Sequence, residues 1–240
     1  MTSSTNKIAR RFDDAASHYD QQASVQAQVA QRLVDDASLL RGPGNILDLG
    51  CGTGFVAEAV RKKWPQASIT ALDHAPAMLE QVRRKLPNTK IIIGDAAQAE
   101  FAPQFDIIFS SMMLHWLPQP RVALKRWQGW LKPGGKTCTA LLIDGSFQEW
   151  RDLCGKAGIK DGLWVMPHDN FADGLSARST IHTLKITYPS AQFFLRRLKS
   201  TGTATPRPGH TPENPAVLRR LLRKAPQPFT TTYRVLYLEI

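Results

Sequence analysis

The chain has 240 residues, 42% of them hydrophobic and 21% charged, and a formal net charge of +11 at pH 7. This length and composition fit one folded domain, with or without a lid, and exclude wholesale disorder. Its three cysteines are widely spaced, so we expect no disulfide framework and no metal site. Its N-terminus lacks an apolar core and no apolar run is long enough to cross a bilayer, so we expect no signal peptide, no membrane span and a cytoplasmic location.

The positive charge is concentrated in the last quarter of the chain. Residues 177–240 hold 11 Lys and Arg against two acids, whereas the first 176 residues hold 20 against 18. This asymmetry favours an acidic partner, which could be nucleic acid, an anionic lipid surface or an acidic protein. A basic face that is merely solvated is the alternative, because charge alone identifies no partner.

The predicted elements alternate between helix and strand up to residue 143. The first forty residues carry apolar side chains at helical spacing. Short apolar runs then predict strands at Ile46–Leu49, Ser68–Leu72, Lys90–Ile93, Phe105–Phe109 and Lys136–Ile143. Helix formers between them predict helices at Phe55–Lys63, Met78–Leu86 and Val122–Leu131. The alternation predicts an α/β fold, with a parallel sheet between helices and a ligand at the carboxyl ends of its strands.

After residue 143 the pattern becomes less regular. Further helices are predicted at Phe147–Lys156, Phe193–Lys199 and Ala216–Lys224, further strands at Thr180–Tyr188 and Thr230–Glu239, and an irregular segment at Gly158–Leu175. We interpret residues 1–240 as a single domain. In it, residues 1–40 form an N-terminal helical segment, and residues 144–228 are partly a small helical lid.

A glycine-rich turn follows the first predicted strand, with the sequence Asp48-Leu49-Gly50-Cys51-Gly52-Thr53-Gly54. Closely spaced glycines let the backbone turn sharply and approach a ligand. A dinucleotide fingerprint would need glycine where Phe55 stands, and a phosphate-binding loop would end in Gly-Lys-Ser/Thr, so neither fits. The carboxylate of Asp48 suits a ligand with a cationic head group, whereas it would repel a pyrophosphate.

Two further acids end the next two predicted strands. Asp73 is placed to accept hydrogen bonds from both ribose hydroxyls of a nucleoside, and Asp95 lies within reach of an adenine amino group. Met78 could pack on the adenine ring. Each acid alone could be a helix cap or a turn residue. Three acids at successive strand ends are hard to explain as caps and predict a nucleoside ligand.

These motifs resemble those of the class I S-adenosylmethionine-dependent methyltransferases. The matching segments are residues 47–54, 72–73, 94–96, 105–111 and 131–135. The resemblance implies a Rossmann-like fold with a seven-stranded, mostly parallel sheet whose last strand is antiparallel. It also implies S-adenosyl-L-methionine as cofactor and S-adenosyl-L-homocysteine as product. The predicted cofactor-binding residues are Asp48, Gly50, Cys51, Gly52, Gly54, Asp73, His74, Met78, Asp95, Ala96, Ser110 and Trp116.

Residues 110–116 lie where this class places the methyl group and its acceptor. They contain no Asn-Pro-Pro-Tyr type motif, which disfavours methylation of a DNA adenine or a protein glutamine. His115 is a candidate general base, with a purely structural histidine as the alternative. Trp116 is expected to pack beside the cofactor.

Segments outside this core resemble the malonyl-acyl-carrier-protein O-methyltransferases of biotin synthesis. They are residues 8–20, 187–189, 195–202, 207–211 and 232–237. The resemblance implies methyl transfer to the free carboxylate of a malonyl thioester on acyl carrier protein. A small-molecule carboxylate or hydroxyl methyltransferase is one alternative. An RNA methyltransferase or basic nucleic-acid-binding protein is another, disfavoured by the few aromatics in the basic region and the lack of a recognised RNA module.

A malonyl carboxylate is ionised at neutral pH, so it needs no general base. The enzyme must supply position and exclude water. Tyr19 is predicted to orient a carboxylate oxygen, with a core aromatic as the alternative. Arg151 is predicted to grip the carboxylate and discriminate malonyl from acetyl groups, with a solvated helix residue as the alternative.

The resemblance to this family also implies a partner for the basic region, because acyl carrier proteins of this pathway are strongly acidic. A basic flank near the active site would steer such a protein and raise its rate of association. The predicted docking residues are Arg196, Arg197, Lys199, Arg219, Arg220, Arg223 and Lys224. Malonyl-CoA is the alternative carrier of the malonyl group, and we expect a monomer that binds no nucleic acid.

Overall fold

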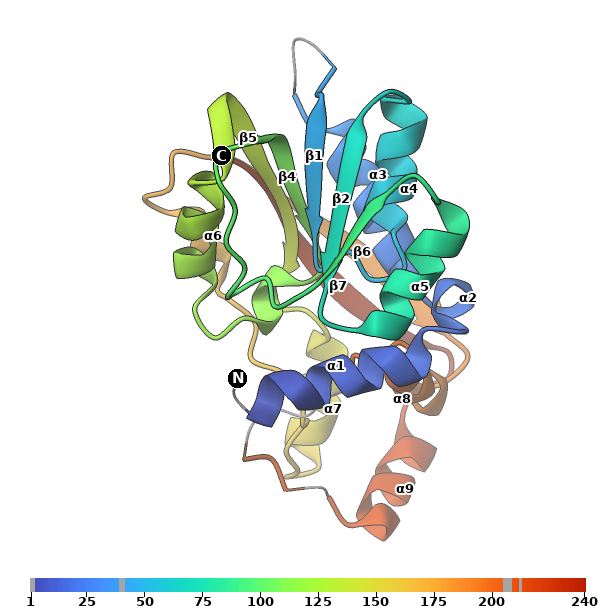
Figure 1. Ribbon diagram of the computed structural model, residues 1–240. Coiled ribbons are helices and arrows are strands. Elements are labelled where there is room, and N and C mark those ends of the chain that lie inside the picture. Colours follow the sequence, from blue (N-terminus) through green and yellow to red (C-terminus); the bar gives the residue numbers. More distant parts are fainter. Residues whose placement is uncertain (1–2, 39–41, 205–208, 212) are drawn as a thin grey trace.

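The computed structural model describes residues 3–38, 42–204, 209–211 and 213–240. Arg207, part of one quoted motif, lies outside these ranges. The described residues form a seven-stranded sheet in the order β3-β2-β1-β4-β5-β7-β6 (Figure 1). The strands are β1 (Asn45–Leu49), β2 (Ser68–Asp73), β3 (Lys90–Ile93), β4 (Phe105–Ser111), β5 (Leu131–Leu142), β6 (Arg178–Tyr188) and β7 (Phe229–Glu239).

Strands β1 to β5 pair in parallel, whereas β7 is antiparallel to both β5 and β6. This confirms the predicted sheet. Side chains alternate between its faces, so Ile46 and Leu47 enter different hydrophobic clusters. Both are fully buried, as expected of a strand with helices on either side.

Helices cover both faces of the sheet. In chain order they are α1 (Ser3–Ala15), α2 (Tyr19–Gln22), α3 (Ser24–Asp35), α4 (Phe55–Lys63), α5 (Pro76–Lys85), the 3₁₀ turn η1 (Leu114–Trp116), α6 (Pro120–Gln128), α7 (Gln148–Lys156), the 3₁₀ turn η2 (Asp169–Ala172), α8 (Ala191–Ser200) and α9 (Pro215–Lys224). Buried residues of α3 and α4 pack on one face, and those of α6 pack on the other. Within the described residues, no helix is long and apolar enough to span a membrane.

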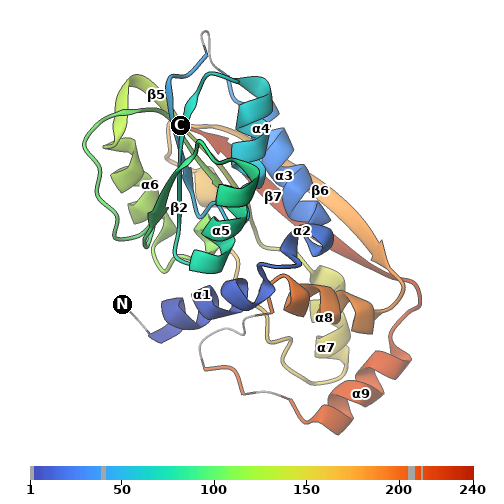
Figure 2. The same cartoon turned by 45° about the vertical axis from the view of Figure 1, so that its right-hand side comes forward.

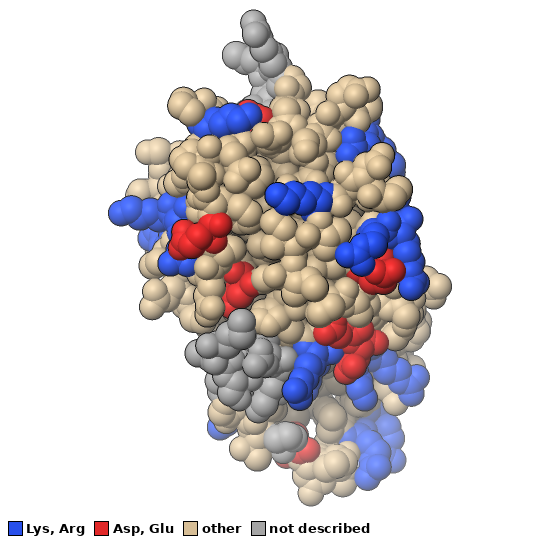
Figure 3. Space-filling view, viewed as in Figure 1, with Lys and Arg blue, Asp and Glu red and all other residues tan. Residues whose placement is uncertain are grey.

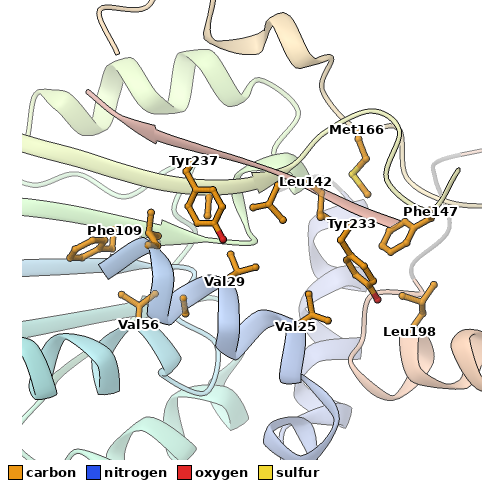
Figure 4. Packing of buried hydrophobic residues seen from close by; sticks show 14 of the residues in the cluster. Val25, Val29, Val56, Phe109, Leu142, Phe147, Met166, Leu198, Tyr233 and Tyr237 are labelled. Atoms are coloured by element: carbon orange, nitrogen blue, oxygen red, sulfur yellow. The ribbon is translucent and has the colours of Figure 1, made fainter. Parts of the chain in front are cut away.

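The cluster under α3 extends beyond the sheet to the later helices. Val25 and Val29 of α3 face Leu142 of β5, and Tyr233 of β7 lies between Val25 and Leu198 of α8 (Figure 4). Burial of this continuous apolar surface ties α7 and α8 to the sheet. The expected lid is therefore packed against the main core, and β6, inside the 144–228 segment, is an edge strand of the sheet itself.

Several element boundaries differ from the sequence-based expectation, most of all those between α6 and β5. The helix predicted at Val122–Leu131 ends at Gln128, and β5 begins at Leu131 rather than at Lys136. The pairing of β4 with β5 shifts register between Phe105 and Ile107. This irregularity lets the Pro-Gly-Gly segment stay within the strand, because bulges tolerate residues that would break a regular ladder.

Helix α1 lies across the carboxyl ends of the parallel strands, where the fold class places its ligands (Figures 1 and 2). Helix α8 lies beside it, and α9 extends further from the sheet (Figure 2). Two segments far apart in the sequence are thus brought to the same edge of the sheet, because about 175 residues separate α1 from α8.

Candidate active site

A cavity of about 660 Å³ opens at the carboxyl ends of the strands. The turn after β1, the ends of β2 and β3, and α5 line one half of it. Helices α1 and α2, η1 and the segment after α7 line the other half. We call these the acidic half and the aromatic half. The acidic half contains Asp48, Asp73 and Asp95, and the aromatic half contains Phe12, Tyr19, Trp116 and Trp164.

The glycine turn has the backbone conformation that its sequence predicts. Gly50, Gly52 and Gly54 have φ angles of 65°, 53° and 95°, in the left-handed region that favours glycine. At Gly50 a side chain would also collide with Met113. The N–H groups of Gly50 and Cys51 donate to the carbonyl oxygen of Leu72 at 2.8 and 3.1 Å, which ties the turn to β2.

Asp73 ends β2 beside this turn. Its Oδ2 accepts the Gly52 N–H at 2.8 Å, and its Oδ1 accepts the Ala75 N–H at 2.9 Å. Each carboxylate oxygen can accept more than one hydrogen bond, so both keep capacity for a ligand hydroxyl. Burial raises the pKa of Asp73 above its usual value, which the backbone N–H donors partly offset.

Asp48 lies under the glycine turn and is only 1% exposed. Neither of its carboxylate oxygens has a hydrogen-bond partner of normal geometry among the described residues. Burial, reinforced by the nearby charge of Asp73, raises the pKa of Asp48 to about 8. A buried carboxyl group without a partner is costly, and here it lines a cavity that could hold a cationic group beside it.

Ten of the twelve predicted cofactor residues line the cavity. They are Asp48, Gly50, Cys51, Gly52, Asp73, His74, Met78, Asp95, Ala96 and Trp116. Gly54 instead begins α4 as its N-cap residue. Ser110 is fully buried away from the lining, whereas its neighbour Ser111 lines the cavity, since successive strand residues face opposite ways.

Tyr19 brings a phenol into the aromatic half. It is 8% exposed, and its ring lies 6.3 Å from that of Phe12 and 6.2 Å from that of Phe55, between ring centroids. No described residue bonds to its hydroxyl. Burial, with the charges of Asp73 and Asp20, raises the pKa of Tyr19, so the hydroxyl stays protonated and can donate a hydrogen bond.

His115 also lines the aromatic half and is 4% exposed. Its Nδ1 accepts the N–H of Leu142 at 3.4 Å, so the proton of the neutral ring is on Nε2. Burial lowers the pKa of His115 to about 3. The ring is therefore neutral at physiological pH and offers an N–H donor, which favours a hydrogen-bonding role over the predicted role of general base.

The structure places Arg151 outside the cavity lining. Its guanidinium donates to the carbonyl oxygens of Ser146 and Trp164 at 3.3 and 3.0 Å, and pairs with Asp161 at 3.3 Å. Trp164 does line the cavity, so Arg151 contacts the loop that carries a cavity residue. The sequence could not indicate this, since the three partners come from the irregular segments before and after α7.

The basic residues of α8 and α9 are exposed with one exception. Arg197 is half-buried and donates to the backbone oxygen of Gln21 at 3.3 Å and to Oε1 of Gln22 at 2.5 Å. The exposed members are Arg196, Lys199, Arg219, Arg220, Arg223 and Lys224. Blue side chains gather where α8 and α9 lie, at the lower right of the molecule (Figure 3).

Several cavity residues were not predicted as site residues. Phe12 belongs to the apolar stripe of the N-terminal helix, and its spacing from Tyr19 is the signal that could have indicated it. Gln26, Trp164 and Tyr233 lie far apart in the chain, and no sequence pattern connects them. Their convergence depends on how the later segments pack onto α3 and β7.

This sheet order, the antiparallel β7 and the acids at the ends of β1, β2 and β3 define a Rossmann-like class I methyltransferase. Residues 46–135 match the family model described as a methyltransferase domain. The Bacillus subtilis protein YcgJ has the same fold at a TM-score of 0.61 and 16% identity, over 88% of this chain and 97% of that one. A plantazolicin methyltransferase solved with a triazolic desmethylPZN analogue and SAH has the same fold at a TM-score of 0.54, with 15% identity and 97% of both chains covered.

Curated relatives narrow the class further. The malonyl-acyl-carrier-protein O-methyltransferase of Magnetococcus marinus is 30% identical over 96% of this chain and 90% of its own length. The enzyme of the same name from a Paenibacillus species is 33% identical over 85% of this chain and 84% of its own length. The bifunctional biotin biosynthesis protein of Bordetella avium is 34% identical, but this chain spans only 48% of it. The chain belongs to the malonyl-acyl-carrier-protein O-methyltransferase family.

Proposed function

We propose that this chain transfers the methyl group of S-adenosylmethionine to the free carboxylate of a malonyl thioester on acyl carrier protein. The observation that carries the proposal is the single cavity in which the acidic half meets the aromatic half. One half suits a nucleoside with a cationic tail, and the other offers neutral donors at Tyr19 and His115. The methyl ester formed would prime synthesis of the pimeloyl precursor of biotin, in line with the names of the relatives.

The acidic half fits S-adenosylmethionine. The unpartnered carboxyl group of Asp48 suits the ammonium of its amino acid part, and the oxygens of Asp73 suit the ribose hydroxyls. Met78 would pack on the adenine, with Asp95 beside the exocyclic amine. The glycine turn lets the backbone approach the ligand closely, and Gly52 has open space where a side chain would stand.

The aromatic half would place the acceptor. A malonyl carboxylate is ionised at neutral pH, so the site need not remove a proton. The hydroxyl of Tyr19 and the Nε2–H of His115 would orient its oxygens, and the surrounding rings would exclude water. When bound, the cofactor supplies a methyl group on its sulfonium sulfur, and the carbon of this methyl group is the electrophile. The positive charge of the sulfonium attracts the carboxylate.

In this proposal Arg151 has an indirect role. Its contacts hold the loop that carries Trp164, so its effect on malonyl recognition would pass through that ring. Direct contact with the carboxylate stays a prediction.

The exposed basic residues of α8 and α9 would dock the acyl carrier protein. Carrier proteins of this kind are acidic, and complementary charge raises the rate of productive encounter. Helix α8 supplies Leu198 to the cavity lining, so a partner bound there lies close to the aromatic half.

We further propose that the chain acts as a monomer in the cytoplasm. Its three cysteines are buried free thiols, which suits a reducing compartment. Light scattering of the active enzyme would test the first point.

A side-by-side transfer assay tests the function. Labelled S-adenosylmethionine is supplied with malonyl carrier protein, malonyl-CoA, acetyl carrier protein or RNA. We expect label in the malonyl species and none in the acetyl species, which lacks a free carboxylate. Label in RNA alone, or in none of the four, would contradict the proposal. Preference for the CoA thioester would retain the chemistry and reject the docking surface.

A further inference from the structure

Helices α1 and α2 are held against the acidic half by two carboxylates. Asp13 of α1 accepts the N–H of Ala77 at 2.8 Å, in the first turn of α5. The N-cap residue of α5, Ala75, provides no side-chain cap. Asp13 therefore takes the place of a capping residue from another helix, where a negative charge is also favoured by the helix dipole.

The second carboxylate, Asp20, joins α2 to two elements at once. Its Oδ1 accepts the hydroxyl of Thr53 at 2.5 Å, and its Oδ2 lies 2.6 Å from Nζ of Lys85 at the end of α5. Thr53 stands within the glycine turn and is 1% exposed. Lys85 also pairs with Glu58 at 3.3 Å, so Asp20 completes a network with α4 and α5.

Helix α2 depends on such contacts for its position. It has four residues and no side-chain cap at either end, and a helix this short is not stable alone. Asp20 holds one side of it, and Arg197 of α8 holds the other through Gln21 and Gln22. The first residue of the helix is Tyr19, whose ring faces the cavity.

We propose that Asp20 is a positioning residue that sets Tyr19 relative to the cofactor turn through its hydrogen bond with Thr53. Because Thr53 is part of the turn that would contact the cofactor, ordering of this turn also orders α2. Cofactor binding and closure of the N-terminal helices over the aromatic half are then linked. Because such coupling is reciprocal, loss of the hydrogen bond between Asp20 and Thr53 weakens the effect of cofactor binding on helix closure and that of helix closure on cofactor binding.

The Thr53 hydroxyl gives a matched pair of variants. Thr53→Val keeps the shape of the side chain and removes the donor, whereas Thr53→Ser keeps the donor. Asp20→Asn weakens the same link from the other side. Glu80→Gln is the control, since Glu80 is a half-buried acid on α5 whose ionic partners among the described residues are Arg83 and Arg84.

The first readout is turnover of malonyl carrier protein at saturating cofactor, and it rests on the proposed function. Displacement of a positioned group by about 1 Å can cost about a hundredfold in rate. We expect Thr53→Val and Asp20→Asn each to lower kcat by about tenfold or more, with little added loss in the double variant. Thr53→Ser and Glu80→Gln should stay within about threefold of wild type, because one keeps the bond and the other lies outside the network.

The second readout needs no acceptor. Arg10 and Arg11 are exposed on α1, so trypsin reports how firmly the N-terminal helices are closed. S-adenosylhomocysteine should slow this cleavage in wild type, Thr53→Ser and Glu80→Gln. In Thr53→Val and Asp20→Asn, at concentrations that calorimetry shows to be saturating, it should give at least threefold less protection.

Two results would overturn the proposal. One is full protection by S-adenosylhomocysteine in both Thr53→Val and Asp20→Asn. The other is an equal loss of kcat and of protection in Thr53→Ser and Thr53→Val, which would mean that the hydroxyl of Thr53 does not cause the effect. If the chain methylates no malonyl thioester, the proposed function fails, but the protease readout still decides the role of Asp20.

Discussion

Asp73 at the end of β2 accepts the N–H of Gly52 at 2.8 Å, so the carboxylate that would bind the ribose also fixes the turn that follows β1. The two residues are 21 positions apart, and the parallel pairing of β1 with β2 brings them together. One acid thus has two tasks: it shapes the turn, and it offers its remaining lone pairs to a ligand.

The first prediction concerns this acid. Asp73→Ala removes both the ligand hydrogen bonds and the restraint on Gly52. A hydrogen bond to a charged group contributes about 1.5–3 kcal/mol, so affinity for S-adenosylhomocysteine should fall by about tenfold or more. Titration calorimetry measures this. Asp152→Ala, an exposed acid on α7, is the control, and unchanged affinity in Asp73→Ala would reject the assignment.

The second prediction concerns the acceptor. Tyr19→Phe removes one hydroxyl from a residue that lines the cavity and leaves the ring packing with Phe12 and Phe55 intact. We expect turnover of malonyl carrier protein to fall by about tenfold, the scale of one lost hydrogen bond to a charged group, with cofactor affinity almost unchanged. Wild-type turnover would return Tyr19 to a packing role alone.

The third prediction concerns pH. The pKa of Asp48 is raised to about 8 without ligand, so the group is protonated at pH 6.5. A bound ammonium favours the ionised form, and the ligand amine, with a usual pKa of about 8, is still charged at that pH. S-adenosylhomocysteine should therefore release about one proton on binding, and its affinity should rise from pH 6 toward pH 8.

Calorimetry in buffers of different ionisation enthalpy measures this proton. Asp48→Asn cannot ionise, so in that variant the release should vanish. The same group also affects the pH dependence of the stability of the unliganded protein. A carboxyl whose folded pKa is raised contributes stability that is present at low pH and lost as pH rises through about 8, so this loss should also vanish in Asp48→Asn. Binding without proton release in the wild type would show that Asp48 does not pair with the ammonium.

The sequence predicted what depends on local signals. Strand β3 and helix α4 have the boundaries that their apolar runs and flanking residues indicate, and Asp48 and Asp73 stand at the predicted strand ends. These signals suffice because the topology of an α/β sheet brings all carboxyl ends to one edge. The acids of the cofactor site could therefore be assigned before any contact was known.

The residues that sequence patterns could not place depend on packing between distant segments. Trp164 comes from a stretch without regular structure, and Arg197 was predicted to be a docking residue although it bonds to α2. Arg151 of α7 likewise has its three partners in the irregular segments on either side of its helix. The sequence pattern of an arginine on an amphipathic helix is the same whether its side chain contacts solvent, a partner or a neighbouring helix.

The last prediction concerns the basic surface of α9. If Arg219 and Arg220 steer an acidic carrier protein, reversing both charges should lower kcat/KM for malonyl carrier protein by about tenfold at low salt, because steering raises association rates by 10-fold to 1,000-fold. The loss should shrink as salt is added, since exposed charges are screened within about 10 Å at 0.1 M ionic strength. Lys62→Glu with Lys125→Glu is the control, with the same change in net charge on exposed residues of α4 and α6.

A second substrate separates steering from damage to the site. Malonyl pantetheine has the same reacting carboxylate and thioester but no acidic protein surface, so the Arg219→Glu, Arg220→Glu variant should use it at the wild-type rate. Both substrates are compared at low and high salt for this variant and for the control pair. Equal losses on the two substrates would mean that the substitutions disturb α9 or the cavity, and steering would be rejected. An equal loss in the control pair would attribute the effect to net charge, because Lys62 and Lys125 lie on other helices.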